Sequence, residues 1–182
     1  MEDERAGHSE QSTDAGRRRF LRIALLGGGA SLVGVPWTGQ AVRAAGKAEA
    51  LLLSCMDYRL VDETERYMSK RGLRNKYDHI ILAGAALGAS TDKYPAWNRT
   101  FWEHLGVAIE LHGIQKVILM DHRDCGAYKV ILGEDIAKDR ARETEVHASK
   151  LRELRKQIQE KHPKLSVELF LMSLDGKVET IT

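Results

Sequence analysis

The sequence is short of the features that define several common protein classes. Only two of its 182 residues are cysteines, Cys55 and Cys125, which excludes a disulfide-rich scaffold and leaves one bridge or two thiolates for a metal. No charge of one sign dominates, because the formal net charge is +2 and, past the first few dozen residues, basic side chains are matched by acidic ones. This balance argues against a nucleic-acid-binding protein. With 43% hydrophobic residues, the composition suits one globular domain.

A long apolar run is also missing. The longest run near the N-terminus, Ile23 to Val35, contains three consecutive glycines and is too short for a transmembrane span of about 20 residues. It follows a basic stretch with Arg17 and Arg18 and precedes small residues, which is the order of a signal peptide. The pattern resembles a twin-arginine signal, with Arg17 and Arg18 as the pair. The alternative is a disordered basic arm followed by an apolar surface helix.

We therefore expect two parts in the chain. Residues 1–45 are predicted to be a cleaved twin-arginine signal peptide, and residues 46–182 to be the mature domain. The mature domain is then expected in the periplasm, with no stable membrane anchor after cleavage.

The mature part alternates short apolar runs with amphipathic stretches. Strands are expected at 50–54, 79–83, 116–120 and 165–173, and helices from a cap at Asp62 to Gly72, from Trp97 to Gly113, and through the stripe His147–Ile158 until just before Pro163. This alternation predicts an α/β fold, with a parallel β-sheet core flanked by helices.

Reactive side chains follow two of the predicted strands. Cys55 comes directly after the first strand, and His122 and Cys125 come after the third. If these strands are neighbours, two thiols and an imidazole converge at the carboxyl edge of the sheet. Such a donor set suits zinc and leaves a fourth position for water. A disulfide between the cysteines is the alternative, but it would leave His122 without a role.

Two charged residues accompany the first cysteine. Asp57 lies two residues after Cys55, and Arg59 two residues after that. A carboxylate beside a guanidinium stays ionised. Asp57 could therefore accept a hydrogen bond from a zinc-bound hydroxide, or move onto the metal as a fourth ligand in a closed state. An ordinary ion pair is the plainer interpretation.

The two motifs together resemble those of β-class carbonic anhydrases. Cys55-Met56-Asp57-Tyr58-Arg59 corresponds to the family's Cys-x-Asp-x-Arg, and His122-Arg123-Asp124-Cys125-Gly126 to its His-x-x-Cys-Gly. The resemblance implies an enzyme, a lyase that reversibly hydrates carbon dioxide to bicarbonate with a zinc-bound hydroxide. It also implies that Cys55, His122 and Cys125 bind zinc, and that Asp57 and Arg59 are catalytic and orient the nucleophile. Because the family builds its pocket at a subunit boundary, a homodimer or higher homo-oligomer is expected.

Departures from the family pattern keep other functions open. The family usually has Arg-Asn-Ala-Gly after its second strand, where this chain has Leu82-Ala83-Gly84-Ala85, and usually has glycine where this chain has Asp121. One alternative is a catalytically silent zinc protein of the same fold that binds a small anion or a partner. Another is a hydrolase of carbonyl sulfide or carbon disulfide.

Overall fold

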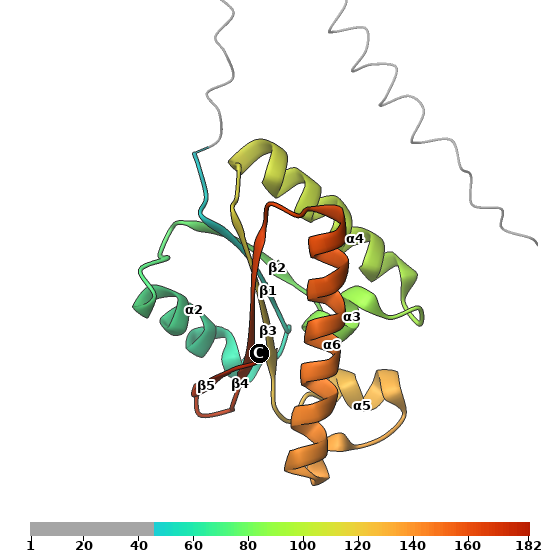
Figure 1. Ribbon diagram of the computed structural model, residues 1–182. Coiled ribbons are helices and arrows are strands. Elements are labelled where there is room, and N and C mark those ends of the chain that lie inside the picture. The colour runs from blue at the N-terminus through green and yellow to red at the C-terminus, as the bar shows by residue number, and fades with distance from the viewer. Residues whose placement is uncertain (1–45) are drawn as a thin grey trace, which may run out of the picture. The chain divides into compact units, whose positions relative to one another are not determined.

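A five-stranded sheet lies at the centre of the computed structural model, which describes residues 46–182 (Figure 1). The predicted signal peptide lies outside these described residues. The elements are β1 (Ala50–Ser54), the 3₁₀ turn η1 (Tyr58–Leu60), α2 (Val61–Lys70), β2 (Tyr77–Ile81), α3 (Ala85–Ser90), α4 (Pro95–Val107), the π-helical turn η2 (Ala108–His112), β3 (Lys116–His122), α5 (Gly126–Leu132), the 3₁₀ turn η3 (Ile136–Lys138), α6 (Arg140–Lys161), β4 (Ser166–Met172) and β5 (Val178–Thr180).

The strand order is β2-β1-β3-β4-β5. The first four strands are parallel, and β5 pairs antiparallel with β4. The predicted α/β fold is therefore confirmed. Strands β1 and β3 pair, which meets the condition on which the convergence of the cysteines depends. The expectation that β4 is the last strand is wrong, because the chain turns after Ser173 and adds β5 at the edge.

Helices cover both faces of the sheet. Alternate side chains of the central strands point to opposite faces, and Figure 1 shows α2 on one side and α3, α4 and α6 on the other. Leu51, Leu53 and Leu119 pack in the larger core, on the side of these three helices. Leu52 and Ile118 pack in the smaller core, on the side of α2. Because both faces are buried, residues 50–53 of β1 and 117–120 of β3 are all apolar.

Several boundaries differ from those predicted. The helix expected to be capped by Asp62 begins two residues earlier than that cap implies, at Val61, so that Asp62 lies in its first turn, where a carboxylate interacts favourably with the helix dipole. The strand expected at 79–83 lies at Tyr77–Ile81. Among the described residues, no helix is both long and apolar enough to cross a membrane.

Candidate metal centre

The carboxyl ends of β1 and β3 bring the three predicted metal ligands together. Cys55 directly follows β1, His122 is the last residue of β3, and Cys125 lies three residues further on. Because the two strands are parallel neighbours, with Ser54 level with Met120, both ends lie at the same edge of the sheet. The ligand atoms of the three side chains lie within 4.8 Å of one another. The convergence predicted from the strand order is therefore present.

The geometry of these three side chains fits a metal ion. The two sulfur atoms are 3.8 Å apart and belong to free cysteines, so they form no disulfide. His122 Nδ1 lies 2.8 Å from the carbonyl oxygen of Arg123 and donates to it, which leaves Nε2 as the coordinating atom. That Nε2 is buried and has no hydrogen-bond partner within residues 46–182. Two sulfurs and one imidazole nitrogen form a typical zinc donor set with a fourth position left for water.

The two thiols are not electrostatically equivalent. A hydrogen bond from Cys125 lowers the pKa of Cys55 to about 4, against the opposing effect of burial. His122 and the backbone N–H of Gly84, 3.3 Å from the sulfur, also contribute to this lowered pKa. The pKa of Cys125 is raised, first by its hydrogen bond to Cys55 and then by burial. Burial lowers the pKa of His122, but the neighbouring Cys55 thiolate more than offsets this, so the pKa is raised.

Asp57 and Arg59 form a close ion pair beside the donor set. Arg59 Nε and Nη2 donate to the two oxygens of Asp57 at 2.9 and 2.7 Å, and the Arg59 backbone N–H adds a third bond of 3.0 Å. Hydrogen bonding from the Arg59 side chain lowers the pKa of Asp57 to about 2. Asp57 Oδ2 lies 3.8 Å from His122 Nε2. An ionised carboxylate with a fixed orientation therefore stands next to the candidate metal position.

Arg59 has a second carboxylate partner that the sequence reasoning missed. Its Nη1 donates to Asp124 Oδ2 at 2.8 Å, and its Nη2 donates to the Asp124 carbonyl oxygen at 3.0 Å. Asp124 lies just before Cys125 and adopts a left-handed backbone with φ of 56°, a conformation that aspartate tolerates better than most residues. The only signal in the sequence was its place between the two ligands of the second motif.

A buried charge cluster fixes the loop between His122 and Cys125. Arg123 donates to Glu143 on α6 at 3.0 Å and to Glu179 on β5 at 2.8 Å. Glu143 in turn accepts the backbone N–H of Asp124 at 2.6 Å. The loop is therefore held by α6 through Glu143 and by β5 through Glu179. These partners lie 20 and 56 residues from Arg123 in sequence, so no local motif could reveal them.

The remaining histidines that form hydrogen bonds lie outside the ligand group. His79 pairs with Ser54, His104 with the Thr100 carbonyl, His112 with Asp78, and His147 with Asp121. His147, predicted as a helix-face residue of α6, is fully buried there. Within the described part of the chain, the group of side chains able to hold a metal is the one formed by Cys55, His122 and Cys125.

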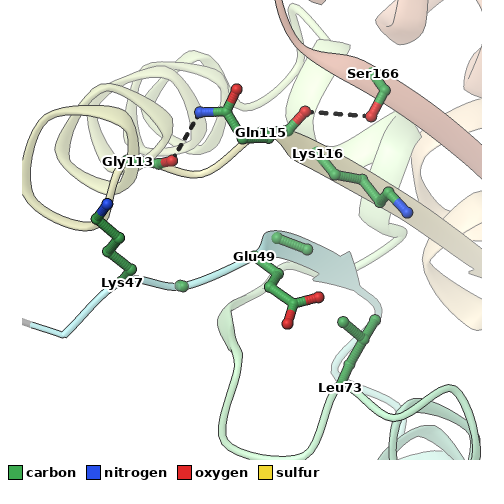
Figure 2. A pocket seen from close by; sticks show the side chains of 9 residues that line it. Lys47, Glu49, Leu73, Gly113, Gln115, Lys116 and Ser166 are labelled. Carbon is green, nitrogen blue, oxygen red and sulfur yellow. Dashed lines mark hydrogen bonds between the residues drawn. The ribbon is translucent and has the colours of Figure 1, made fainter.

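A larger pocket lies at the opposite edge of the sheet (Figure 2). It has a volume of about 570 Å³ and is lined at the amino ends of β1, β3 and β4. Its polar groups bond one another: Gln115 donates to the Gly113 carbonyl at 2.9 Å, and Ser166 donates to the Gln115 carbonyl at 3.2 Å (Figure 2). Because the strands are parallel, this pocket is separated from the cysteines by the length of the strands. A hollow of about 80 Å³ lies beside Cys125 itself.

Comparison with known sequences links residues 45–182 to a described family. This segment matches the family described as "Putative carbonic anhydrase". An uncharacterized protein of Rickettsia conorii is 40% identical over 150 residues, which cover 82% of this chain and 81% of that protein.

Solved structures with a similar fold are carbonic anhydrases. The carbonic anhydrase of Streptococcus mutans superposes with a TM-score of 0.51 at 18% identity, covering 93% of this chain and 96% of that one. The β-carbonic anhydrase CafD of Aspergillus fumigatus gives a TM-score of 0.50 at 13% identity, covering 84% and 97%. At these identities the likeness establishes the fold, and function has to be argued from the site.

Proposed function

The chain belongs to the carbonic anhydrase family that its residues 45–182 match, and from this premise we propose that it is a zinc enzyme that reversibly hydrates carbon dioxide to bicarbonate. One observation carries the proposal. The Cys55, His122 and Cys125 ligand atoms lie within 4.8 Å of one another, and the carboxylate of Asp57 lies 3.8 Å from His122 Nε2.

The donor set favours zinc over other common metals. Two thiolates and an imidazole are soft and borderline ligands, whereas magnesium and calcium prefer oxygen. Zinc held by Cys55, His122 and Cys125 would lower the pKa of a water in its fourth position and so would supply a nucleophile near neutral pH. The protein contributes the tautomer of His122, fixed by the Arg123 carbonyl, and the hydrogen bond from Gly84 to the sulfur of Cys55.

Asp57 has the charge and the position to orient a nucleophile. With a pKa lowered to about 2, it is ionised at neutral pH and can only accept hydrogen bonds. A nucleophile that still carries a proton can donate to it, and the donation fixes the direction of the attacking lone pair. Arg59 supplies three of the contacts that hold the carboxylate in place. Positioning of this kind accounts for much of the rate gained by enzymes.

Carbon dioxide, the substrate that the family match suggests, is a small, neutral electrophile. Carbonyl sulfide and carbon disulfide share its linear shape, so the test must include them.

We also propose that residues 1–45 direct export by the twin-arginine route and that the mature protein works in the periplasm as a homodimer or larger homo-oligomer. The basic, apolar and small-residue order of the N-terminal segment supports export. Exposed apolar side chains beside the site, those of Met56, Tyr58 and Val61, support self-association.

The decisive experiment combines metal analysis with a rate measurement on purified residues 46–182. We expect about one zinc per chain and stopped-flow hydration of carbon dioxide well above background. Cys125→Ser is expected to lose stoichiometric zinc, because its thiolate is a ligand. Zinc bound at full stoichiometry with background hydration would favour the silent zinc protein instead. Turnover of carbonyl sulfide or carbon disulfide alone would favour the hydrolase.

A further inference from the structure

A buried carboxylate stands directly behind the candidate metal centre. Asp121 precedes His122 on β3 and is 1% exposed. Burial of a carboxylate is costly unless its oxygens are hydrogen-bonded. Asp121 Oδ1 accepts the backbone N–H of Ala86 at 3.0 Å. Its Oδ2 accepts His147 Nδ1 at 2.9 Å and the hydroxyl of Tyr128.

The partners of Asp121 lie on the segments that carry or contact the metal ligands. Ala86 is in the first turn of α3, two residues after Gly84, whose N–H donates to the sulfur of Cys55. Asp121 itself is joined by a peptide bond to His122, so it lies on the same strand end as the imidazole ligand.

The third ligand is connected through α5. Tyr128 lies in the first turn of this helix, which begins directly after Cys125. The backbone N–H of Tyr128 donates to the carbonyl oxygen of Cys125 at 3.1 Å. His147 lies on α6, the longest helix of the described chain, and its hydrogen bond joins this helix to Asp121 as well. One carboxylate thus contacts α3, α5 and α6 from the end of β3.

We propose that Asp121 is a positioning residue for the metal centre, which fixes the mutual placement of the segments bearing Cys55, His122 and Cys125. This inference rests on the zinc site of the proposed function. It assigns to Asp121 more than a share in fold stability: loss of its hydrogen-bond acceptors shifts the ligands relative to one another while the chain remains folded. Groups that hydrogen-bond metal ligands directly change metal affinity by about 10–100-fold when mutated, and Asp121, which acts one contact further out, is compared with this scale.

Asp121→Asn is the informative variant, because it keeps the size of the side chain but presents an NH₂ group where two donors now converge. Leu154→Ala is the matched control. Leu154 is fully buried on α6, the helix of His147, and its truncation destabilises the fold without touching the Asp121 hydrogen bonds. Both variants and the wild type are compared by zinc affinity, measured against a chromophoric chelator, and by the visible spectrum of the cobalt-substituted protein.

We expect Asp121→Asn to bind zinc about 10–100-fold more weakly and to show a shifted cobalt spectrum. Leu154→Ala is expected to keep both properties while unfolding at lower denaturant. A folded Asp121→Asn with wild-type affinity and spectrum would overturn the inference, as would an equal loss of affinity in Leu154→Ala. Should Asp121→Asn not fold, Tyr128→Phe decides in its place: a weaker zinc affinity supports the inference and an unchanged one overturns it. A wild-type chain that binds no zinc would instead refute the proposed function, on which the inference depends.

Discussion

A substitution of Asp57 is expected to change the hydration rate without changing metal binding. Asp57→Asn keeps the side-chain size but removes the charge and adds a donor, so it can no longer select a nucleophile that carries a proton. We expect the variant to keep its zinc and fold and to lose hydration rate by about 10²-fold or more, the scale of a lost catalytic proton acceptor. The measurement is stopped-flow hydration with zinc content determined on the same samples.

Asp62→Asn is the control for Asp57→Asn. Asp62 is an exposed carboxylate in the first turn of α2, close in sequence but outside the site. The Asp62→Asn variant should leave the hydration rate unchanged. An Asp57→Asn variant with full zinc and an unaltered rate would remove Asp57 from the mechanism and leave the enzyme proposal standing.

The ligand pKa values predict how zinc binding depends on pH. Cys125 and His122 have raised pKa values, so a proton remains on Cys125 at neutral pH and His122 holds its proton more tightly than a free imidazole. Both bind zinc only after losing that proton. Zinc affinity should therefore rise with pH, and calorimetric titrations in buffers of different ionisation heat should show release of about one to two protons per zinc. Binding without proton release would show that the thiols are already ionised.

Helix α3 contains a glycine, Gly88, that lies very close to the backbone of Ala83. A methyl group added at Gly88 would overlap the Ala83 carbonyl oxygen, whereas one added at Gly106 in α4 would meet nothing within 4 Å. We expect Gly88→Ala to destabilise the protein by about 1–3 kcal/mol, because the displaced helix cannot repack. Gly106→Ala should stabilise it by about 0.5–1 kcal/mol, since glycine is a poor helix former. Urea unfolding of both variants tests this, and equal shifts would contradict it.

The long elements were predictable, and the short ones were not. Strands β1 and β3 are apolar because both faces of a parallel sheet are buried, and this signal is local in sequence. By contrast, α3 and α5 have six and seven residues, too few for a helical period to emerge, and β5 has three. Their existence depends on packing against the sheet and α6, which no local pattern records.

The same distinction applies to the candidate site. Cys55, His122 and Cys125 could be predicted, because their residue types and their positions after strands are visible in sequence. Asp121 and Asp124 could not be, because a carboxylate near a ligand looks like any other until its partners are known. Those partners come from other elements, up to 65 residues away in the case of Asp124 and Arg59.

For the molecule as a whole, the exposed surface beside the site predicts self-association. Met56, Tyr58 and Val61 are 65%, 85% and 63% exposed. Apolar side chains gathered next to a functional site commonly mark an interface. We expect light scattering at micromolar concentration to give at least a dimer for residues 46–182, and Tyr58→Ser to shift it toward monomer. A monomer with full activity would contradict this.

Export is the second property of the whole chain. Changing Arg17 and Arg18 together to lysine keeps the charge but loses the guanidinium geometry. If residues 1–45 are a twin-arginine signal, the double variant should stay in the cytoplasm as an uncleaved precursor, which cell fractionation and immunoblotting would reveal. Normal delivery of the double-lysine protein to the periplasm would show that another signal is used.

The strand order also sets when the loop that carries the candidate ligands can form during synthesis. Strand β3 pairs with β1 on one side and with β4 on the other. In the pairing with β4, His122 lies level with Met172, and the Arg123 N–H donates to the Met172 carbonyl at 2.8 Å. Glu143 and Glu179, which hold the ligand loop, both lie in the last quarter of the chain. A ribosome-bound nascent chain that already contains Cys55, His122 and Cys125 therefore still lacks the supports of its loop. The ligand loop can therefore take the geometry described only when nearly the whole chain has been synthesised.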